Sequence, residues 1–322
     1  MIITRTPYRI PLAGGGTDLD FYYKKRGGSL ISATFNQYVF TILLRRQIDN
    51  KILIQTTNTQ FAESTKQIKH PIIKETLRFF KIKNKFQVGT FSTLPTRAGL
   101  GSSSSLIVGI IFGLSKILKI KLSKKKIAKI AFLIERKKLK YQGGWQDQII
   151  SSYGGINKIN ISKNGKFIVR KIDIKKKILN KLENKLVLVF TKETRDSTGI
   201  IASQKLVQRK NVKNYDKIKS YVKIMEIALK KGDYRKIGEI FHEHWKIKKK
   251  LSNSISNSKL DNIYLNLLKE KSFIGGKLIG AGGGGFFLMV TKNIASSIKY
   301  LESKKINFTK LKFVQNGSSK II

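Results

Sequence analysis

Residues 94–105 of the chain read Leu94-Pro95-Thr96-Arg97-Ala98-Gly99-Leu100-Gly101-Ser102-Ser103-Ser104-Ser105. A predicted strand precedes this segment, and the apolar residues over 106–118 recur with the spacing of a buried helix. The first four N–H groups of that helix lack partners within it, while Gly99 and Gly101 allow an anion to approach the main chain. The segment therefore predicts a phosphate-binding loop, with a serine-capped core helix after a flexible turn as the alternative.

Two further glycine-rich segments accompany this loop. They read Arg5-Thr6-Pro7-Tyr8-Arg9-Ile10-Pro11-Leu12-Ala13-Gly14-Gly15-Gly16-Thr17-Asp18 and Gly275-Gly276-Lys277-Leu278-Ile279-Gly280-Ala281-Gly282-Gly283-Gly284-Gly285-Phe286. The second has the glycine spacing of a dinucleotide-binding loop, but a predicted strand follows it where that loop needs a helix. A Walker A motif is absent, because neither Gly-Lys pair in the chain is followed by Ser or Thr.

The three segments, in this order and at these separations, resemble the three motifs of the GHMP kinases, the superfamily that includes galactokinase, homoserine kinase and mevalonate kinase. The resemblance spans nearly the whole chain and is most specific in the joint occurrence of 95–105 and 280–285. Within the superfamily, the segments 13–18, 242–252 and 261–264 most resemble the D-glycero-D-manno-heptose 7-phosphate kinases. This implies an ATP- and Mg²⁺-dependent sugar kinase that phosphorylates the anomeric hydroxyl to give the 1,7-bisphosphate, a precursor of nucleotide-activated heptose for surface glycans.

Two other functions stay open at this point. The first is the same chemistry on fucose, mannose, galactose or another phosphosugar. The second is a basic nucleic-acid-binding protein that keeps the fold without catalysis. Intact Asp147, Glu135 and serine loop argue against the second, and a sugar panel assayed for ATP consumption would decide the first.

Composition indicates a globular chain. Its 322 residues, 41% of them hydrophobic, are enough to bury a sizeable core and to form two lobes. The longest apolar run, 106–114, is too short to span a membrane, and no signal-peptide pattern precedes Arg5. The absence of cysteine excludes disulfides and thiolate metal sites, so we expect a cytoplasmic protein that binds no membrane.

The formal net charge of +46 usually indicates nucleic acid or an anionic membrane as a partner. Here lysine is spread through every region together with isoleucine and asparagine, and no arginine-rich stripe stands out. We therefore interpret the charge as a composition bias and expect no specific nucleic-acid partner. The sequence does not determine the oligomeric state.

The order of predicted elements favours an α+β architecture. Strands at 38–44 and 51–54 are interpreted as a hairpin around Asp49-Asn50. Further predicted strands cover 86–92, 156–161, 166–172 and 186–190, and predicted helices cover 72–80, 123–139, 213–230, 234–249 and 259–269. We expect two lobes, 1–172 and 173–322, with the active site in the cleft between them.

The resemblance implies a catalytic pair. Asp147, in Gly143-Gly144-Trp145-Gln146-Asp147-Gln148, matches the catalytic aspartate of many GHMP kinases, and a carboxylate can accept the proton of a sugar hydroxyl. Arg9 matches the basic residue near that aspartate and would offset charge that develops during transfer. The alternatives are a helix-capping aspartate in a loop and an ordinary arginine at the end of a strand.

The same resemblance implies the nucleotide and metal ligands. The expected ATP-binding residues are Pro95, Arg97, Gly99, Leu100, Gly101, Ser102, Ser103, Ser104 and Ser105. Ser103 and Glu135 would ligate Mg²⁺, which prefers hard oxygen ligands. The alternative for Glu135 is a surface ion pair with Arg136 or Lys138.

The expected substrate-binding residues are Asp18, Thr17, Gly16, Arg195, Lys248, Gly282, Gly283 and Gly284. Asp18 matches the galactokinase-type aspartate that binds sugar hydroxyls, with an N-cap of a helix over 19–24 as the alternative. Arg195 and Lys248 are candidates for holding a phosphate that the substrate already carries. His242 and His244 lie two apart on a predicted helix and do not share a face, so a zinc site is not expected.

Overall fold

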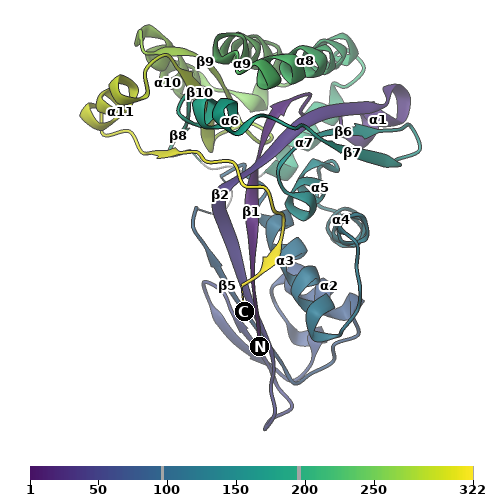
Figure 1. The fold of residues 1–322 in the computed structure, drawn as a ribbon. Helices are drawn as coiled ribbons and strands as arrows, with labels where there is room; N and C mark the ends of the chain where they lie inside the picture. The colour runs from purple at the N-terminus through teal and green to yellow at the C-terminus, as the bar shows by residue number, and fades with distance from the viewer. Residues whose placement is uncertain (96–97, 194–196, 322) are drawn as a thin grey trace.

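The computed structural model describes residues 1–95, 98–193 and 197–321, and its strands form two sheets (Figure 1). In the described part of the chain the larger sheet runs β12-β1-β2-β5-β3-β4, and β2 also pairs with β6, which pairs with β7. Its strands are β1 (Ile2–Ala13), β2 (Gly28–Arg45), β3 (Ile52–Gln55), β4 (Thr59–Ala62), β5 (Phe86–Ser92), β6 (Ile156–Ile161), β7 (Phe167–Lys171) and β12 (Ser319–Lys320).

The helices of this half lie on one side of the larger sheet and beyond its upper end (Figure 1). They are α1 (Asp20–Arg26), the short 3₁₀ segment η1 (Thr65–Gln67), α2 (Pro71–Phe79), α3 (Ser102–Ile117), α4 (Lys124–Phe132), the π-helical segment η2 (Leu133–Lys138) and α5 (Gln146–Tyr153). Helix α3 packs closely on β1 and β2 because Gly113 carries no side chain: a Cβ there would lie 2.5 Å from Leu43. This packing fixes the start of α3, at Ser102, against the larger sheet.

The smaller sheet is antiparallel, in the order β11-β8-β10-β9. Its strands are β8 (Leu186–Phe190), β9 (Phe273–Leu278), β10 (Phe286–Thr291) and β11 (Phe308–Lys310). The accompanying helices are α6 (Lys176–Glu183), α7 (Ser197–Leu206), α8 (Val212–Lys231), α9 (Tyr234–Lys249), η3 (Asn253–Ile255), α10 (Ser258–Lys269) and α11 (Ile294–Ser303). No helix that the structure describes has the length and apolar content needed to cross a bilayer.

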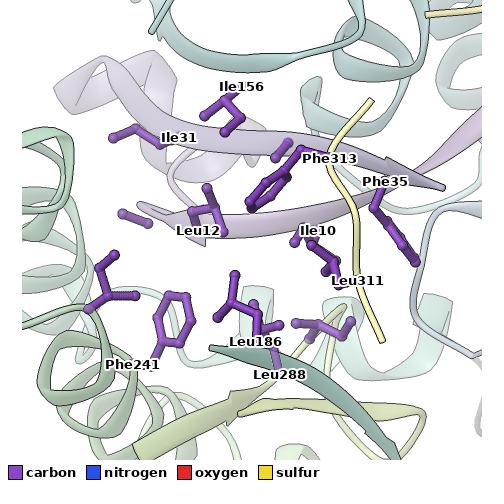
Figure 2. Packing of buried hydrophobic residues seen from close by; sticks show 14 of the residues in the cluster. Ile10, Leu12, Ile31, Phe35, Ile156, Leu186, Phe241, Leu288, Leu311 and Phe313 are labelled. Carbon is purple, nitrogen blue, oxygen red and sulfur yellow. The ribbon is translucent and has the colours of Figure 1, made fainter. Parts of the chain in front are cut away.

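One hydrophobic cluster joins the two sheets (Figure 2). Ile10 and Leu12 of β1 face Leu186 of β8 and Leu288 of β10, and Phe241 of α9 closes the side of the cluster. All five side chains are at most 3% exposed. The chain that follows β1, residues 14–18, is called the first glycine loop. Because the cluster is continuous, the end of β1 that leads into this loop is fixed relative to the smaller sheet.

Most predicted elements are confirmed, but the hairpin of 38–44 with 51–54 is wrong. Strand β5 lies between the two strands: Val88 pairs with Leu43 of β2 on one side and with Ile54 of β3 on the other. All three side chains are buried on the same face of the sheet, so a strand more than thirty residues further along the chain replaces the local partner. The helix predicted over 123–139 changes to π-helical geometry after Phe132.

The division of the chain at residue 172 stays a prediction. Strand β7 ends at Lys171 and β8 begins the smaller sheet at Leu186. The chain returns to the larger sheet at its other end, where Lys320 of β12 pairs with Thr4 of β1. The mixed larger sheet, the antiparallel smaller sheet and the helices around them make the architecture α+β, as predicted.

Candidate active site

The serine loop leads directly into α3. Gly101 adopts a left-handed conformation, with φ of 81°, and α3 begins at Ser102. Gly99 lies against the third glycine segment, since a Cβ on Gly280 would lie 2.7 Å from the Cα of Gly99. The first helix N–H groups of α3 therefore lie close to a loop that connects β9 and β10, which belong to the other sheet.

Arg9 and Asp147 form a two-pronged ion pair beside this loop. Arg9 Nε donates to Asp147 Oδ1 at 2.6 Å, and a second guanidinium nitrogen donates to Oδ2 at 2.8 Å. The third guanidinium nitrogen, Nη1, donates to the carbonyl of Gly99 at 2.7 Å. A Cβ on Gly101 would lie 3.2 Å from Asp147 Oδ2, so the pair lies at the mouth of the loop. Arg9 is buried within β1, and Asp147 lies in the first turn of α5, which has no side-chain cap, so both alternatives for this pair are wrong.

The electrostatics of Asp147 favour the ionised carboxylate. Burial alone would raise its pKa, but the charge and hydrogen bonds of Arg9, with a smaller contribution from Arg136, hold the pKa below its ordinary value. Asp147 therefore carries a negative charge at neutral pH. Its side chain keeps 19% exposure, which leaves room for a small polar group to approach an oxygen.

Glu135 is fully buried and surrounded by donors. Ser103 Oγ donates to Oε1, while Ser104 Oγ and Gln148 Nε2 donate to Oε2, each at 2.6 Å. Arg136 Nη1 lies 3.5 Å from Glu135 Oε1. The alternative expected an ion pair of Glu135 at the surface: the pair with Arg136 is present, but it is buried, with the side chains of Glu135 and Arg136 1% and 10% exposed. We call Arg9, Asp147, Ser103 and Glu135 the catalytic corner.

The oxygen donors of this corner fit Mg²⁺. The Ser103 hydroxyl and the Glu135 carboxylate are adjacent hard oxygens, the ligand type that this ion prefers. Gln148 adds a side-chain oxygen, Oε1, that is buried and has no hydrogen-bond partner in the part of the chain that the structure describes. Buried polar oxygens without partners are uncommon in native proteins, so an oxygen-binding ion is consistent with this corner.

Asp18 belongs to the neighbouring wall of the site. Its Oδ2 accepts a hydrogen bond from the main-chain N–H of Gln146 at 3.0 Å, next to Asp147. Helix α1 begins after Leu19 without a side-chain cap, so the alternative in which Asp18 caps that helix is wrong. Burial raises the pKa of Asp18, and the nearby charge of Asp147 raises it further.

The first glycine loop is held by its own threonine rather than by Asp18. Thr17 Oγ1 donates to the carbonyl of Gly14 at 2.7 Å and is also 2.8 Å from the carbonyl oxygen of Ser29. A Cβ on Gly16 would lie 3.0 Å from the ring of Tyr215. The loop therefore packs against α8 of the other half.

The third glycine segment packs against main chain on two sides. Gly283 N donates to the carbonyl of Ile255, and Gly285 N donates to that of Glu193. Cβ atoms on Gly282 and Gly284 would clash with Ile255 and Glu193 respectively. These glycines are thus required for close packing, and their predicted contact with substrate stays a prediction.

Lys248 lies at the end of α9, half-buried beside the third segment. Its Nζ donates to the carbonyls of Leu278 and Gly280, at 3.0 and 2.7 Å. Lys277 is 1% exposed and donates to the carbonyl of Leu12 at 2.9 Å, with His244 Nδ1 at 3.5 Å. We call Lys248, Lys277 and His244 the lysine cluster.

Several residues near the site were not predicted from the sequence. They are Arg136, Gln148, Gln204, Tyr215 and Lys277. Gln204 donates to the carbonyl of Ala281 and accepts from Tyr215, which connects the third segment to the first loop. Gln148 lies in the segment quoted around Asp147, Lys277 lies in the third glycine segment, and Arg136 follows Glu135 directly, but nothing in the sequence marked Gln204 or Tyr215.

Two predicted residues, Arg97 and Arg195, lie outside the described residues. Pro95 is exposed at the start of the serine loop, and Leu100 is buried, with its carbonyl accepting from the Arg9 main chain. A surface hollow of about 640 Å³ at the other end of α3, around Phe112 and Leu122, contains none of the predicted site residues.

Phosphoryl transfer uses positioned phosphates, positive charge and a carboxylate, and a helix start with flanking glycines, a paired arginine and buried carboxylates could supply them. Residues 68–155 match the family model for the GHMP kinases N terminal domain, and residues 225–299 match the model for the GHMP kinases C terminal. A Campylobacter jejuni D-glycero-alpha-D-manno-heptose 7-phosphate kinase is 34% identical over 302 residues, which cover 88% of each chain. The chain belongs to the GHMP kinases and is an ATP-dependent phosphotransferase, which confirms the predicted family and enzyme class.

One further relative and one solved structure are similar to this chain. The mevalonate kinase of Methanocaldococcus jannaschii is 32% identical over 222 residues, 68% of this chain and 66% of that protein. A crystal structure of a D-glycero-D-manno-heptose 1-phosphate kinase from Bacteroides thetaiotaomicron superposes with a TM-score of 0.84 over 100% of this chain and 99% of that one. Its identity of 24% supports the fold alone, and that fold is the predicted one.

Proposed function

We propose that this kinase transfers the γ-phosphoryl group of ATP to the anomeric hydroxyl of D-glycero-D-manno-heptose 7-phosphate and forms the 1,7-bisphosphate. The acceptor is supported by the 34% identity with a heptose 7-phosphate kinase over 88% of the chain. The observation that carries the reaction type is the Arg9–Asp147 pair at the mouth of the serine loop. It puts a carboxylate beside a helix start, a feature of proteins that commonly binds phosphates.

The serine loop would hold the triphosphate. The N–H groups at the start of α3 and the serine hydroxyls are donors, and the helix dipole favours negative charge there. Gly99 and Gly101 keep the approach to these donors free of side chains. We assign nucleotide binding to Pro95, Arg97 and Gly99 through Ser105, as the resemblance implies.

Ser103 and Glu135 would hold Mg²⁺, with Gln148 beside them. When bound, the ion offsets negative charge on the phosphates during transfer. Glu135 is kept in place by three donors, so its carboxylate does not have to reorganise when the nucleotide binds.

Asp147 would orient the anomeric hydroxyl and accept its proton. A carboxylate with a lowered pKa is a weak base, so its main contribution is to fix the hydroxyl oxygen in line with the phosphoryl group. Proton transfer then occurs late, once the new bond has acidified the hydroxyl. Arg9 holds Asp147 in position and supplies fixed positive charge beside the transferring group.

The first glycine loop would bind the sugar. Asp18 has an oxygen fixed by the Gln146 N–H, and its carboxylate is an acceptor for sugar hydroxyls. Gly16, Thr17 and Gly282–Gly284 would shape the pocket around it. Because the reaction consumes ATP and feeds the synthesis of nucleotide-activated heptose, we assign it to the cytoplasm.

A panel of acceptors tests this assignment. We expect kcat/KM for heptose 7-phosphate to exceed that for unphosphorylated heptose, mannose, fucose or galactose by at least about 10³, because two or three charge-assisted hydrogen bonds of about 1.5–3 kcal/mol are lost with the phosphate. Initial rates of ATP-dependent ADP formation measure it. A neutral sugar that equals the heptose phosphate would overturn the acceptor and leave the kinase class intact.

A further inference from the structure

The larger sheet has one covered face and one open face. On the covered face Thr4 bonds to Thr41, and a Cβ on Gly109 of α3 would lie 3.3 Å from the Thr4 hydroxyl oxygen. Successive side chains of a strand point to opposite faces, so the neighbours of these threonines point away from α3. Among the described residues, the helices of this half lie on the α3 side or beyond the upper end of the sheet (Figure 1).

Six apolar side chains from β1, β2, β4 and β5 share the open face. Ile3 pairs with Ile42 and Phe40 pairs with Phe91, so these four point the same way. The registers of β5, β3 and β4 place Phe61 in one row with Leu44. We call the following six residues the open sheet face: Ile3, Phe40, Ile42, Leu44, Phe61 and Phe91.

Two phenylalanines of this face project into solvent. Phe91 is 61% exposed and Phe61 is 59% exposed, while the other four side chains are half-buried. A Cβ on Gly89, between them on β5, would lie at least 3.5 Å from Ile42 and Phe91, so there is room above it for the side chain of a partner. Large apolar side chains exposed together commonly mark a surface that binds another molecule.

The size of the open sheet face suits a weak pair of proteins. Five strands spaced by about 4.8 Å, each contributing about five residues with a rise of about 3.3 Å, cover on the order of 500 Å². Specific complexes bury about 800 Å² on each partner, and weak ones bury less than about 600 Å². For a contact over this whole face we therefore expect a dissociation constant in the micromolar range.

The open sheet face is nearly uncharged in a chain that is otherwise rich in lysine. Lys and Arg make up 65 of the 322 residues, yet β1 to β5 contain no lysine, aspartate or glutamate. Arg5 lies at one margin, 5.5 Å over the ring of Tyr38. Arg46 lies at the other margin over Phe61, and its charge is balanced by Asp49, whose Oδ1 accepts from Arg46 Nε at 2.7 Å.

This distribution of charge favours a second copy of the chain as the partner. With a formal net charge of +46, two copies repel each other, and most approaches bring exposed lysines together. Contact through the open sheet face instead brings apolar side chains together. An acidic partner would be drawn to the lysine-rich surfaces and would gain nothing from a neutral one. A neutral apolar face fits another neutral apolar face, and each copy carries one.

We propose that the open sheet face is a homodimer interface, in which two copies pack sheet against sheet about a twofold axis. Phe61 and Phe91 of each copy lose their contact with water there, which is the main driving force for association. None of the six residues belongs to the catalytic corner, so each copy keeps its own active site. The inference goes beyond the proposed function and does not depend on it.

Sedimentation velocity of the nuclease-treated full chain tests the proposal. Between about 2 and 100 µM protein, we expect the mass to rise from 36.6 kDa toward twice that value. Raising NaCl from about 0.15 M to about 0.5 M should lower the dissociation constant by about threefold or more, because salt screens the repulsion between the copies. A dimer that dissociates as salt increases is held by charges and contradicts the proposal.

Two substitutions locate the interface. Phe91→Lys and Phe61→Lys each put an ammonium on the open sheet face, and each should raise the dissociation constant by at least about 30-fold. Both positions are exposed, so we expect the variants to fold, and their melting temperatures check this. Ile168→Lys is the matched control: it adds the same charge at a 71% exposed position on β7, and it should dimerise like the wild type.

Each outcome decides the proposal. A dimer in the wild type and in Ile168→Lys, with monomers in both phenylalanine variants, supports it. A wild type that stays monomeric at about 100 µM in both salt concentrations overturns it without any variant. So does a dimer that persists in both phenylalanine variants, or a monomer that binds neutral phosphatidylcholine vesicles through Phe91. Turnover of ATP with the sugar panel tests the kinase assignment separately, because a monomeric chain contains the whole catalytic corner.

Discussion

The catalytic corner and the lysine cluster lie side by side and handle charge in opposite ways. All four carboxylate oxygens of Asp147 and Glu135 accept hydrogen bonds from named donors. The hydrogen bonds of the Lys248 and Lys277 amines instead go to main-chain carbonyls and a histidine ring, and neither amine has a carboxylate partner among the described residues. A carboxylate held by several donors is ready to orient a reacting group, whereas these amines connect the third glycine segment and the end of β1 to their surroundings. We interpret the first region as built for chemistry and the second as built for structure.

The largest expected effect comes from Asp147 and tests whether the first region carries the chemistry. Asp147→Asn removes the negative charge and the proton acceptor, so we expect kcat to fall by about 10²–10⁴ with little change in nucleotide affinity. Steady-state kinetics and nucleotide titration measure the two quantities. Asp173→Asn, on an exposed carboxylate, is the matched control. Near-normal turnover in a folded Asp147→Asn protein would remove Asp147 from the reaction.

A second prediction concerns nucleotide binding by the serine loop. Gly101→Val would force a side chain into a left-handed position 3.2 Å from Asp147, so we expect nucleotide affinity to fall by more than about 100-fold. Gly199→Val is the control, because a Cβ there meets nothing within 4 Å. Circular dichroism checks that both variants fold. Unchanged nucleotide binding by Gly101→Val would return the loop to a capping role.

The thermal stability of the ligand-free protein tests the Arg9–Asp147 pair of the catalytic corner. Arg9→Met leaves the buried Asp147 carboxylate without its partner, so we expect the melting temperature to fall by about 5–10 °C. Scanning calorimetry of the ligand-free protein measures this. A change of less than about 1 °C would mean that the pair contributes nothing to the fold.

Lys248 should show a smaller effect that depends on pH. Its pKa is about 7 in the folded protein and 10.5 when unfolded, so between these values the unfolded chain binds more protons and folding becomes more favourable as pH rises. Lys248→Met lacks this gain. We expect the wild type to gain about 2–5 °C in melting temperature over the variant between pH 7 and pH 10. Parallel curves would show that Lys248 is an ordinary solvated lysine.

The two regions also differ in what the sequence revealed. Asp147, Arg9, Ser103 and Glu135 occur in motifs that could be matched to a family, and the structure brings them together. Lys277 is one of 65 basic residues, and its burial arises only when β9 packs against α9.

Sequence patterns do not show tertiary packing, and this also explains the errors in the predicted fold. Local alternation located β3, β5 and the second half of β2, but it missed the first half of β2 and could not show that β5 inserts between the other two strands. Glu135 is buried within a π-helical segment, a geometry that helix propensity does not predict. Strand neighbours and buried charge states are tertiary properties, so they required the structure.

The central claim is that the catalytic corner phosphorylates the anomeric oxygen of a heptose that already carries a phosphate. Phosphorus NMR of the protein with ATP, Mg²⁺ and heptose 7-phosphate tests it most directly. The account predicts a new phosphate resonance coupled to the anomeric proton, with one ADP formed for each phosphate transferred and the original 7-phosphate signal retained. ADP formation without that resonance, or a new phosphate at any other position of the sugar, would contradict it.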